Sequence, residues 1–206
     1  MMMIEIYSHP KTSFPNTMKY WLLSLLLFTA LPVFPCGTER WAVKVGTDPD
    51  AGAIDTSKVK HTTLQHLVDL PKPRHLPEAA RVNVTEKTVW EVEAQIIKFK
   101  SEADGDFHVV IADAQGRTMI VELPDSDCLK GSPFKKLANA ARKHFEERFP
   151  PTRSKRMRTL KNGVKATVRG IGFFDKIHGQ TGVAPNVIEI HPVLKICFEG
   201  EDCQRK

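Results

Sequence analysis

Motifs that mark several classes of enzymes and metal proteins are missing from this 206-residue sequence. No two cysteines are separated by two residues, which argues against a structural zinc site. No Gly-x-Ser-x-Gly run indicates a serine nucleophile, and neither a phosphate-binding loop nor a dinucleotide-binding glycine pattern occurs. Internal repeats and low-complexity tracts are also missing. The sequence therefore favours one ordinary domain without a familiar catalytic signature.

A bilayer-spanning apolar run is missing too, because the most apolar stretch is too short to cross a membrane. Lys19 supplies a positive charge, and residues 21–34 then supply 14 largely apolar positions, the proportions of a secretory signal. We predict that residues 1–36 are an upstream extension and signal peptide. The protein is then exported, to the periplasm or outside the cell, without a stable membrane span. A buried core helix or a retained anchor is the alternative.

Four cysteines remain after this leader, and an even number in an oxidising compartment predicts two disulfides. Four cysteines allow three pairings. The local pairing of Cys197 with Cys203 closes a short tail loop. It leaves Cys36 to pair with Cys128, which ties the start of the domain to its middle.

Positive charge is concentrated in residues 130–169, which hold 13 Lys or Arg against two Glu, while the whole chain carries a net charge of +6. Such a basic segment can attract nucleic-acid phosphates or an anionic membrane surface. A solvated helix face followed by a charged linker is the alternative. Non-specific nucleic-acid binding through residues 130–169 is therefore one predicted function, although outward aromatic residues for base stacking are scarce.

Local patterns divide the mature chain into segments. Residues 37–87 are rich in turn formers and prolines, which predicts an irregular N-terminal segment with a short helix within residues 62–70. We expect this segment to wrap around the following domain, held by Cys36 and Trp41. Residues 88–197 form that domain, and residues 198–206 form a C-terminal tail.

Alternating apolar and polar residues predict strands over residues 88–100, 106–113, 118–123, 164–174 and 186–196. Residues 131–149 instead predict a helix, which starts near Ser132 and Pro133 and stops at Pro150. The order is three strands, one long helix and two strands. It predicts a mainly β fold, an OB-fold-like five-stranded barrel. A five-stranded sandwich with a packed helix is the competing architecture.

Three stretches of the chain resemble a family of small, exported, uncharacterised bacterial proteins: CGTERWAVKVGTDPDAG, GDFHVVIADAQGRTMIVELPDSDC and VRGIGFFDKIHGQTGVAPNVIEIHPVLKI. The resemblance covers nearly all of the mature chain. It implies export, an OB-like barrel, and a disulfide between an early cysteine and the one after Leu-Pro-Asp. It implies no activity. The basic connector and the additional Cys197 and Cys203 depart from the family, so shared partners do not follow.

Strand alternation predicts which side chains share a surface. With the apolar residues of each strand turned inward, His108, Glu122, Glu189 and His191 all point outward. Two imidazoles and two carboxylates on one sheet face are a candidate site for zinc or another divalent ion. Such an ion would support hydrolysis, with His178 transferring protons. Cross-strand pairs in water are the alternative.

The loop between the last two predicted strands is dense in polar residues. Asp175, His178, Gln180 and Asn186 lie among glycines, which permit close backbone approach to a ligand. The alternative is a turn that bonds only itself. We take these four residues as the candidate ligand-binding set. The leading prediction is a non-catalytic exported protein that recognises a small polar ligand or an extracellular polymer, with the metal-dependent hydrolase as the first alternative.

Overall fold

The computed structural model describes residues 36–37, 39–152 and 154–203. They belong to one compact unit, residues 34–206. The predicted upstream extension and signal peptide lie outside the described residues, except for Cys36. Within the described part, each helix is too short or too polar to cross a membrane.

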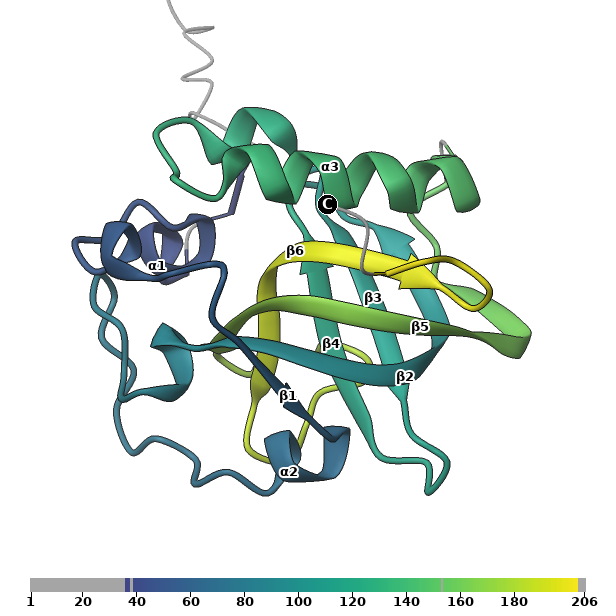
Figure 1. Ribbon diagram of the computed structural model, residues 1–206, viewed down its shortest axis with the longest axis horizontal. Helices are drawn as coiled ribbons and strands as arrows, with labels where there is room; N and C mark the ends of the chain where they lie inside the picture. Colours follow the sequence, from purple (N-terminus) through teal and green to yellow (C-terminus); the bar gives the residue numbers. More distant parts are fainter. Residues whose placement is uncertain (1–35, 38, 153, 204–206) are drawn as a thin grey trace, which may run out of the picture. The chain divides into compact units, whose positions relative to one another are not determined.

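The described structure is mainly β, with six strands and short helices (Figure 1). The strands are β1 (Val59–Thr62), β2 (Val89–Ser101), β3 (Phe107–Ala112), β4 (Thr118–Leu123), β5 (Arg158–Phe174) and β6 (Ile188–Phe198). The α-helices are α1 (Trp41–Val45), α2 (Leu64–Val68) and α3 (Lys135–Arg148). The five predicted strands and both predicted helices are therefore confirmed, with ends that differ by a few residues.

Five of the strands form a closed ring of hydrogen-bonded neighbours. The strand order is β1-β2-β3-β4-β6-β5, and β2 pairs with β5 as well. β4 and β6 run parallel, whereas the other ring pairs are antiparallel. The ring thus joins segments that lie far apart in the sequence.

The sixth strand, β1, corrects the prediction that residues 37–87 contain no strand. It pairs in parallel with residues 89–92 of β2. β3 pairs with β2 only from Gln95 onward, so the first residues of β2 have a free edge. β1 fills that edge because unpaired backbone groups at a buried edge cost free energy.

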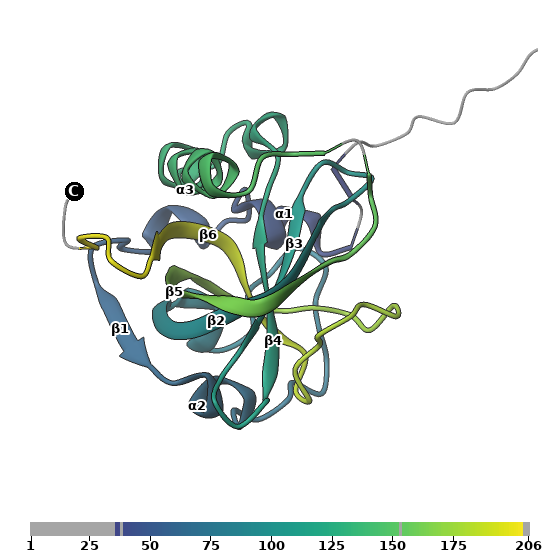
Figure 2. The ribbon, with the colours of Figure 1, turned by 90° about the vertical axis from the view of Figure 1, so that its right-hand side faces the viewer.

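The core confirms the predicted strand alternation. Alternate apolar residues of these strands join one buried cluster: Phe107, Val109 and Ile111 of β3, Met119, Val121 and Leu123 of β4, and Ile188 and Ile190 of β6. α3 lies across one end of the strands, above β6 (Figures 1 and 2). Its Phe145 and Phe149 contact Phe99, and Phe145 also packs against Phe107. Aromatic side chains therefore seal this end of the ring.

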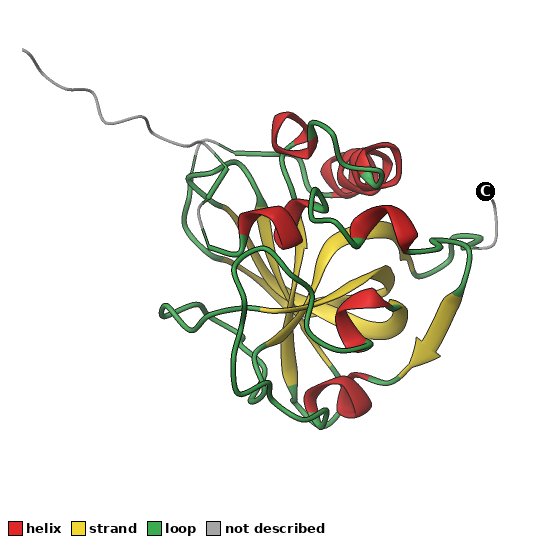
Figure 3. Ribbon diagram, turned by 90° about the vertical axis from the view of Figure 1, so that its left-hand side faces the viewer, coloured by secondary structure: helices red, strands yellow, loops and turns green. Residues whose placement is uncertain are grey.

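The N-terminal segment wraps over one side of the strands, as Figure 3 shows. A disulfide joins Cys36 to Cys128, with a sequence separation of 92 residues. α1 ends at Gly46, whose φ of 71° is left-handed. A Cβ atom there would lie 2.3 Å from the ring of Phe134, so glycine lets α1 stop and pack closely.

The predicted second disulfide is wrong: Cys197 and Cys203 are free thiols. Their side chains interact by a hydrogen bond rather than a covalent bond, and burial raises the pKa of Cys197 to about 12. The tail is held instead by the ammonium of Lys195, which donates to the carbonyl of Cys203 over 2.8 Å. A thiol that stays protonated is a poor nucleophile for disulfide exchange.

Candidate functional site

The four polar residues predicted to share a sheet face do lie together. His108 on β3 stands directly opposite Glu122 on β4. Glu189 on β6 pairs with Ile120, and His191 follows two residues later on the same face of β6. The ring brings β4 and β6 side by side, so side chains more than 60 residues apart in sequence meet.

The prediction that these side chains point into solvent is wrong. Their exposed fractions are 1% for His108, 6% for Glu122, 2% for Glu189 and 0% for His191. α1 and the loop between β5 and β6 close over them. In that loop, Gly182 lies so near β3 that a Cβ atom would come within 2.4 Å of Val110. The outer face of β3, β4 and β6 is therefore a second buried layer.

Glu122 is the centre of this buried group. One of its carboxylate oxygens, Oε2, lies 3.0 Å from Nζ of Lys44 on α1 and 2.9 Å from Nδ1 of His191. The other oxygen, Oε1, lies 3.4 Å from Nδ1 of His108. Burial raises the pKa of Glu122, but Lys44 and the two imidazoles outweigh it and hold the pKa well below its usual range. Glu122 is therefore ionised.

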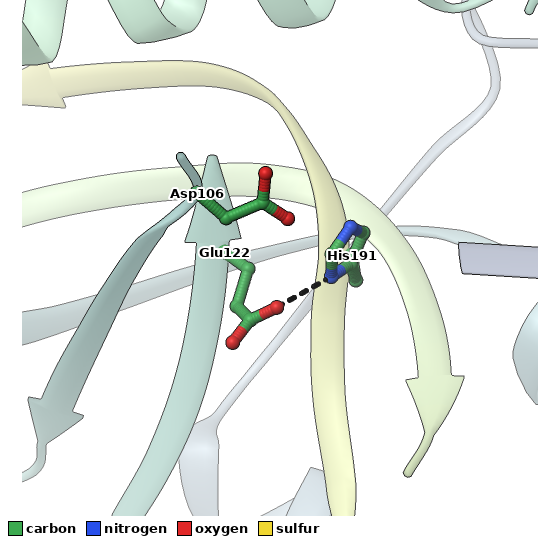
Figure 4. Close-up of side chains that lie close together, drawn as sticks. All are labelled: Asp106, Glu122 and His191. Carbon is green, nitrogen blue, oxygen red and sulfur yellow. Dashed lines mark ion pairs between the residues drawn. The ribbon is translucent and has the colours of Figure 1, made fainter. Parts of the chain in front are cut away.

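Asp106, which precedes β3, completes the group. Ligand atoms of Asp106, Glu122 and His191 lie within 4.8 Å of one another (Figure 4). We call Asp106, His108, Glu122, Glu189 and His191 the carboxylate–imidazole cluster. Asp106 was not predicted as a site residue from the sequence, although it lies two residues before His108 and so shares its side of the strand. The contribution of Lys44 was not predicted either.

Several polar atoms of the cluster have no hydrogen-bond partner. Among the described residues, they are Nδ1 of His108, Oε2 of Glu122, Oε2 of Glu189 and both ring nitrogens of His191. Glu122 and His191 approach each other to 2.9 Å, but not with the alignment of a hydrogen bond. Buried polar groups are normally satisfied, because an unpaired group costs its full desolvation free energy.

The carboxyl groups of the cluster differ in protonation. Burial and the charge of Asp104 raise the pKa of Asp106 to about 8. Burial, followed by the charges of Glu122 and Asp175, raises the pKa of Glu189 well above its usual range. The cluster therefore holds more carboxyl groups than its own positive charge can keep ionised.

The imidazoles also differ. Nε2 of His108 lies 2.8 Å from the carbonyl oxygen of Thr181, which accepts but cannot donate, so Nε2 carries a proton. The other nitrogen of His108 then faces the carboxylate of Glu122. Burial lowers the pKa of His191, which favours the neutral ring. A histidine that donates one N–H to a backbone carbonyl is the usual arrangement of a metal ligand.

The predicted ligand-binding loop behaves differently from the cluster. Asn186 is buried and donates to the carbonyls of Leu67 and Leu70, so it attaches the loop to α2. Gln180 donates to Asp175 over 3.0 Å. His178 is half exposed, and its backbone N–H donates to Gln180. The loop bonds mainly itself and its neighbours, as expected for the structural alternative.

The basic segment of residues 130–169 spans α3, the connector and the first part of β5. Some of its cations already have partners. The guanidinium of Arg158 lies 4.6 Å from the ring centre of Phe99, and Lys155 donates to the carbonyl of Glu102 over 2.7 Å. Nucleic-acid binding by this segment stays a prediction.

Four of the surface pockets among the described residues have volumes of about 480, 540, 570 and 730 Å3. They are lined by residues outside the carboxylate–imidazole cluster. The cluster is therefore an enclosed polar site and not the floor of one of these pockets.

No family model and no curated protein matches this chain. The chain is similar to part of an OBody bound to hen egg-white lysozyme, with 16% identity over 57% of this chain and 87% of that chain, and a TM-score of 0.37. It is also similar to part of a protein assigned as an aspartyl-tRNA synthetase from Leishmania major Friedlin. There the identity is 11% over 71% of this chain and 22% of that chain, with a TM-score of 0.40. At these scores neither likeness carries an argument.

Proposed function

We propose that this protein is an exported, non-catalytic binding protein with an OB-fold-like barrel, and that its carboxylate–imidazole cluster binds a divalent metal ion. The closed ring supports the barrel, together with the helix between its third and fourth strands in sequence. The leader-like sequence and the disulfide between Cys36 and Cys128 support export.

The observation that carries the metal proposal is the set of buried polar atoms that lack a hydrogen-bond partner. Five such atoms belong to His108, Glu122, Glu189 and His191. Imidazole nitrogens and carboxylate oxygens are both ligands of zinc and related divalent ions. A bound cation would satisfy these atoms and would let Asp106 and Glu189 ionise, because its charge opposes the burial and the neighbouring carboxylates that raise their pKa.

The ligand chemistry favours a first-row transition metal such as zinc over calcium or magnesium. Asp106, Glu122 and His191 supply the compact ligand set, and His108 and Glu189 supply further donors. Calcium and magnesium prefer oxygen ligands alone, whereas imidazole suits zinc, copper, iron and nickel. The two histidines therefore argue for a borderline or softer ion.

The burial of the cluster favours binding without catalysis. A metal-dependent hydrolase needs an open coordination position that a substrate can reach. Here α1 and the loop between β5 and β6 cover the cluster, and the four described pockets lie elsewhere. We therefore favour an enclosed metal, bound as cargo or as a structural ion, over the hydrolase.

The test is metal analysis of the full chain purified without chelator, followed by titration of metal-free protein with Zn²⁺, Mn²⁺ and Ca²⁺. We expect about one Zn²⁺ per chain and stabilisation of about 2.7 kcal/mol when free Zn²⁺ is a hundred times its dissociation constant. Ca²⁺ should bind far more weakly.

A pair of variants separates this site from adventitious binding. His191→Ala should abolish Zn²⁺ binding, whereas His61→Ala should not, because His61 is exposed on β1. Circular dichroism would establish that both variants fold. Failure of folded wild-type protein to bind any of the three ions would refute the proposal, as would equal Zn²⁺ affinity in the two variants.

A further inference from the structure

Lys44 places an ammonium group against the carboxylate–imidazole cluster from a different part of the chain. It lies on α1, a helix of five residues in the N-terminal segment. Its Nζ atom lies 3.0 Å from Oε2 of Glu122, and both side chains are largely buried. The ammonium is the counter-charge that α1 supplies to the strands.

The charge environment of Lys44 extends over the cluster. Burial lowers the pKa of Lys44, but the charges of Glu122, Asp175 and Glu189 outweigh this and raise it above its ordinary value. Asp106 acts in the same direction. Lys44 is therefore a permanent cation that interacts with the very carboxyl groups that would bind a metal ion.

A divalent ion and this ammonium compete for the same carboxylate. Glu122 belongs to the compact ligand set, and its Oε2 atom is the one that Lys44 approaches. Two cations a few ångströms apart in a buried site repel each other strongly. Both ring nitrogens of His191 and Oε2 of Glu189 lack a hydrogen-bond partner, so the ammonium satisfies only part of the cluster.

We infer that Lys44 is a tethered cation that stands in for the metal ion, and that it withdraws from Glu122 when a divalent ion binds. This inference rests on the proposed function. The site then exists in two states, one neutralised from within the chain and one neutralised by metal. The metal affinity of the site is set by the free-energy difference between these two states, because a ligand that must displace a resident group binds more weakly.

The rest of the N-terminal segment confines the change to Lys44 and the end of α1. The preceding Arg40 is fully buried and donates to Glu86 and to the carbonyls of Pro77, Ala80 and Phe174. The disulfide at Cys36 adds a covalent anchor. The buried pair of Asp48 and Arg81 follows α1 and holds the chain there, so the change is limited to the Lys44 side chain and the turn of α1 that carries it.

The experiment measures the dissociation constant for Zn²⁺ by calorimetry on metal-free protein. It compares the full-length, disulfide-bonded wild type with Lys44→Met and Lys44→Arg. We expect Lys44→Met to bind at least tenfold more tightly, because it removes the resident cation but keeps the apolar stem. Lys44→Arg should stay close to wild type. Lys58→Met is the matched control, since Lys58 is exposed and pairs only weakly with Asp55, and its affinity should be unchanged.

Hydrogen exchange of the wild type provides a readout without mutation. Saturating Zn²⁺ should speed amide exchange in residues 42–46 while it slows exchange in β4 and β6, whereas a metal that merely tightens the fold would slow all three. Equal or weaker affinity in folded Lys44→Met, or slower exchange of residues 42–46 with Zn²⁺, would overturn the inference.

The two proposals fail in different ways. If neither the wild type nor Lys44→Met binds metal, the proposed function fails and the inference falls with it. If the wild type binds Zn²⁺ and Lys44→Met binds no better, only the role of Lys44 is refuted. If only Lys44→Met binds Zn²⁺, the natural protein has no metal function, and the result supports the claim that Lys44 occupies the site in place of a metal ion.

Discussion

Two buried groups of charged residues contact α1, and they differ in how completely their atoms are hydrogen-bonded. In the first, which we call the arginine cluster, Arg40 and Arg81 pair with Glu86 and Asp48. Both oxygens of Glu86 accept from Arg40 and each also accepts a backbone N–H. In the carboxylate–imidazole cluster, five polar atoms have no hydrogen-bond partner, and Glu122 depends on ion pairs with Lys44 and His191.

The difference separates a structural role from a binding role. Burying a charge costs several kcal/mol unless geometry and hydrogen bonds compensate for the lost water, and the arginine cluster meets that condition. It fixes the N-terminal segment to the end of β5 through Phe174, whose carbonyl accepts from Arg40 over 2.6 Å. The carboxylate–imidazole cluster does not meet this condition. Its nitrogen and oxygen atoms that lack hydrogen bonds are therefore available to bind a metal ion.

The sharpest comparison changes one buried glutamate in each cluster to its isosteric amide. Glu86→Gln should lower the free energy of unfolding by about 3–5 kcal/mol, because it leaves Arg40 with an uncompensated buried charge. Glu189→Gln in metal-free protein should change it by at most about 1 kcal/mol, since Glu189 favours its neutral form. Urea unfolding at pH 7 measures both, and similar losses would erase the proposed distinction.

Removing the disulfide tests how much stability this covalent anchor of the N-terminal segment adds to that provided by the arginine cluster. Cys36→Ser with Cys128→Ser should lower the free energy of unfolding by about 2–4 kcal/mol, because the bond closes a long loop in the unfolded chain. Cys197→Ser with Cys203→Ser is the matched control and should have little effect, since those thiols are free. Thermal unfolding under non-reducing conditions would decide, and equal effects would contradict the assignment.

The smallest effect is a pH dependence of the carboxylate–imidazole cluster. The pKa of Asp106 is raised from 3.8 to about 8, so between these values the folded protein holds a proton that the unfolded chain releases. Stability from this group is therefore greatest at low pH and falls as pH rises toward 8.

We expect the metal-free protein to lose about 1 kcal/mol of unfolding free energy between pH 7 and pH 8 through this proton. The pKa of Asp106 also depends on the charges of Asp104, Glu122 and Lys44. The proton itself is on Asp106, so Asp106→Asn should reduce the dependence of the unfolding free energy on pH. Urea midpoints across the pH series provide the measurement. A variant with the same slope as wild type would assign the effect to another group.

Much of the fold could be predicted from the sequence because its information is local. Alternation correctly predicted the strands, the apolar residues inside the ring, and the shared face of His108, Glu122, Glu189 and His191. The helix around Phe145 was equally clear from its apolar spacing and flanking prolines. β1 was missed because its four residues show no distinctive pattern and pair only where β3 ends.

The environment of the site could not be predicted, because it depends on contacts between distant segments. The sequence places Lys44 in an irregular stretch, and nothing local indicates that it approaches Glu122, 78 positions later. The same contact buries residues that alternation assigns to solvent. The contacts of Asn186 could not be predicted for the same reason, since its partners are the carbonyls of Leu67 in α2 and of Leu70 just after it.

The position of β1 at the end of the strand order has a consequence for solubility. A terminal strand offers free backbone groups on which another molecule can grow a cross-β assembly. β1 is four residues long, and its exposed Lys60 and His61 place cationic or titratable side chains beside that edge. Short, charged borders discourage intermolecular recruitment, so the segment that completes β2 also protects the protein against aggregation.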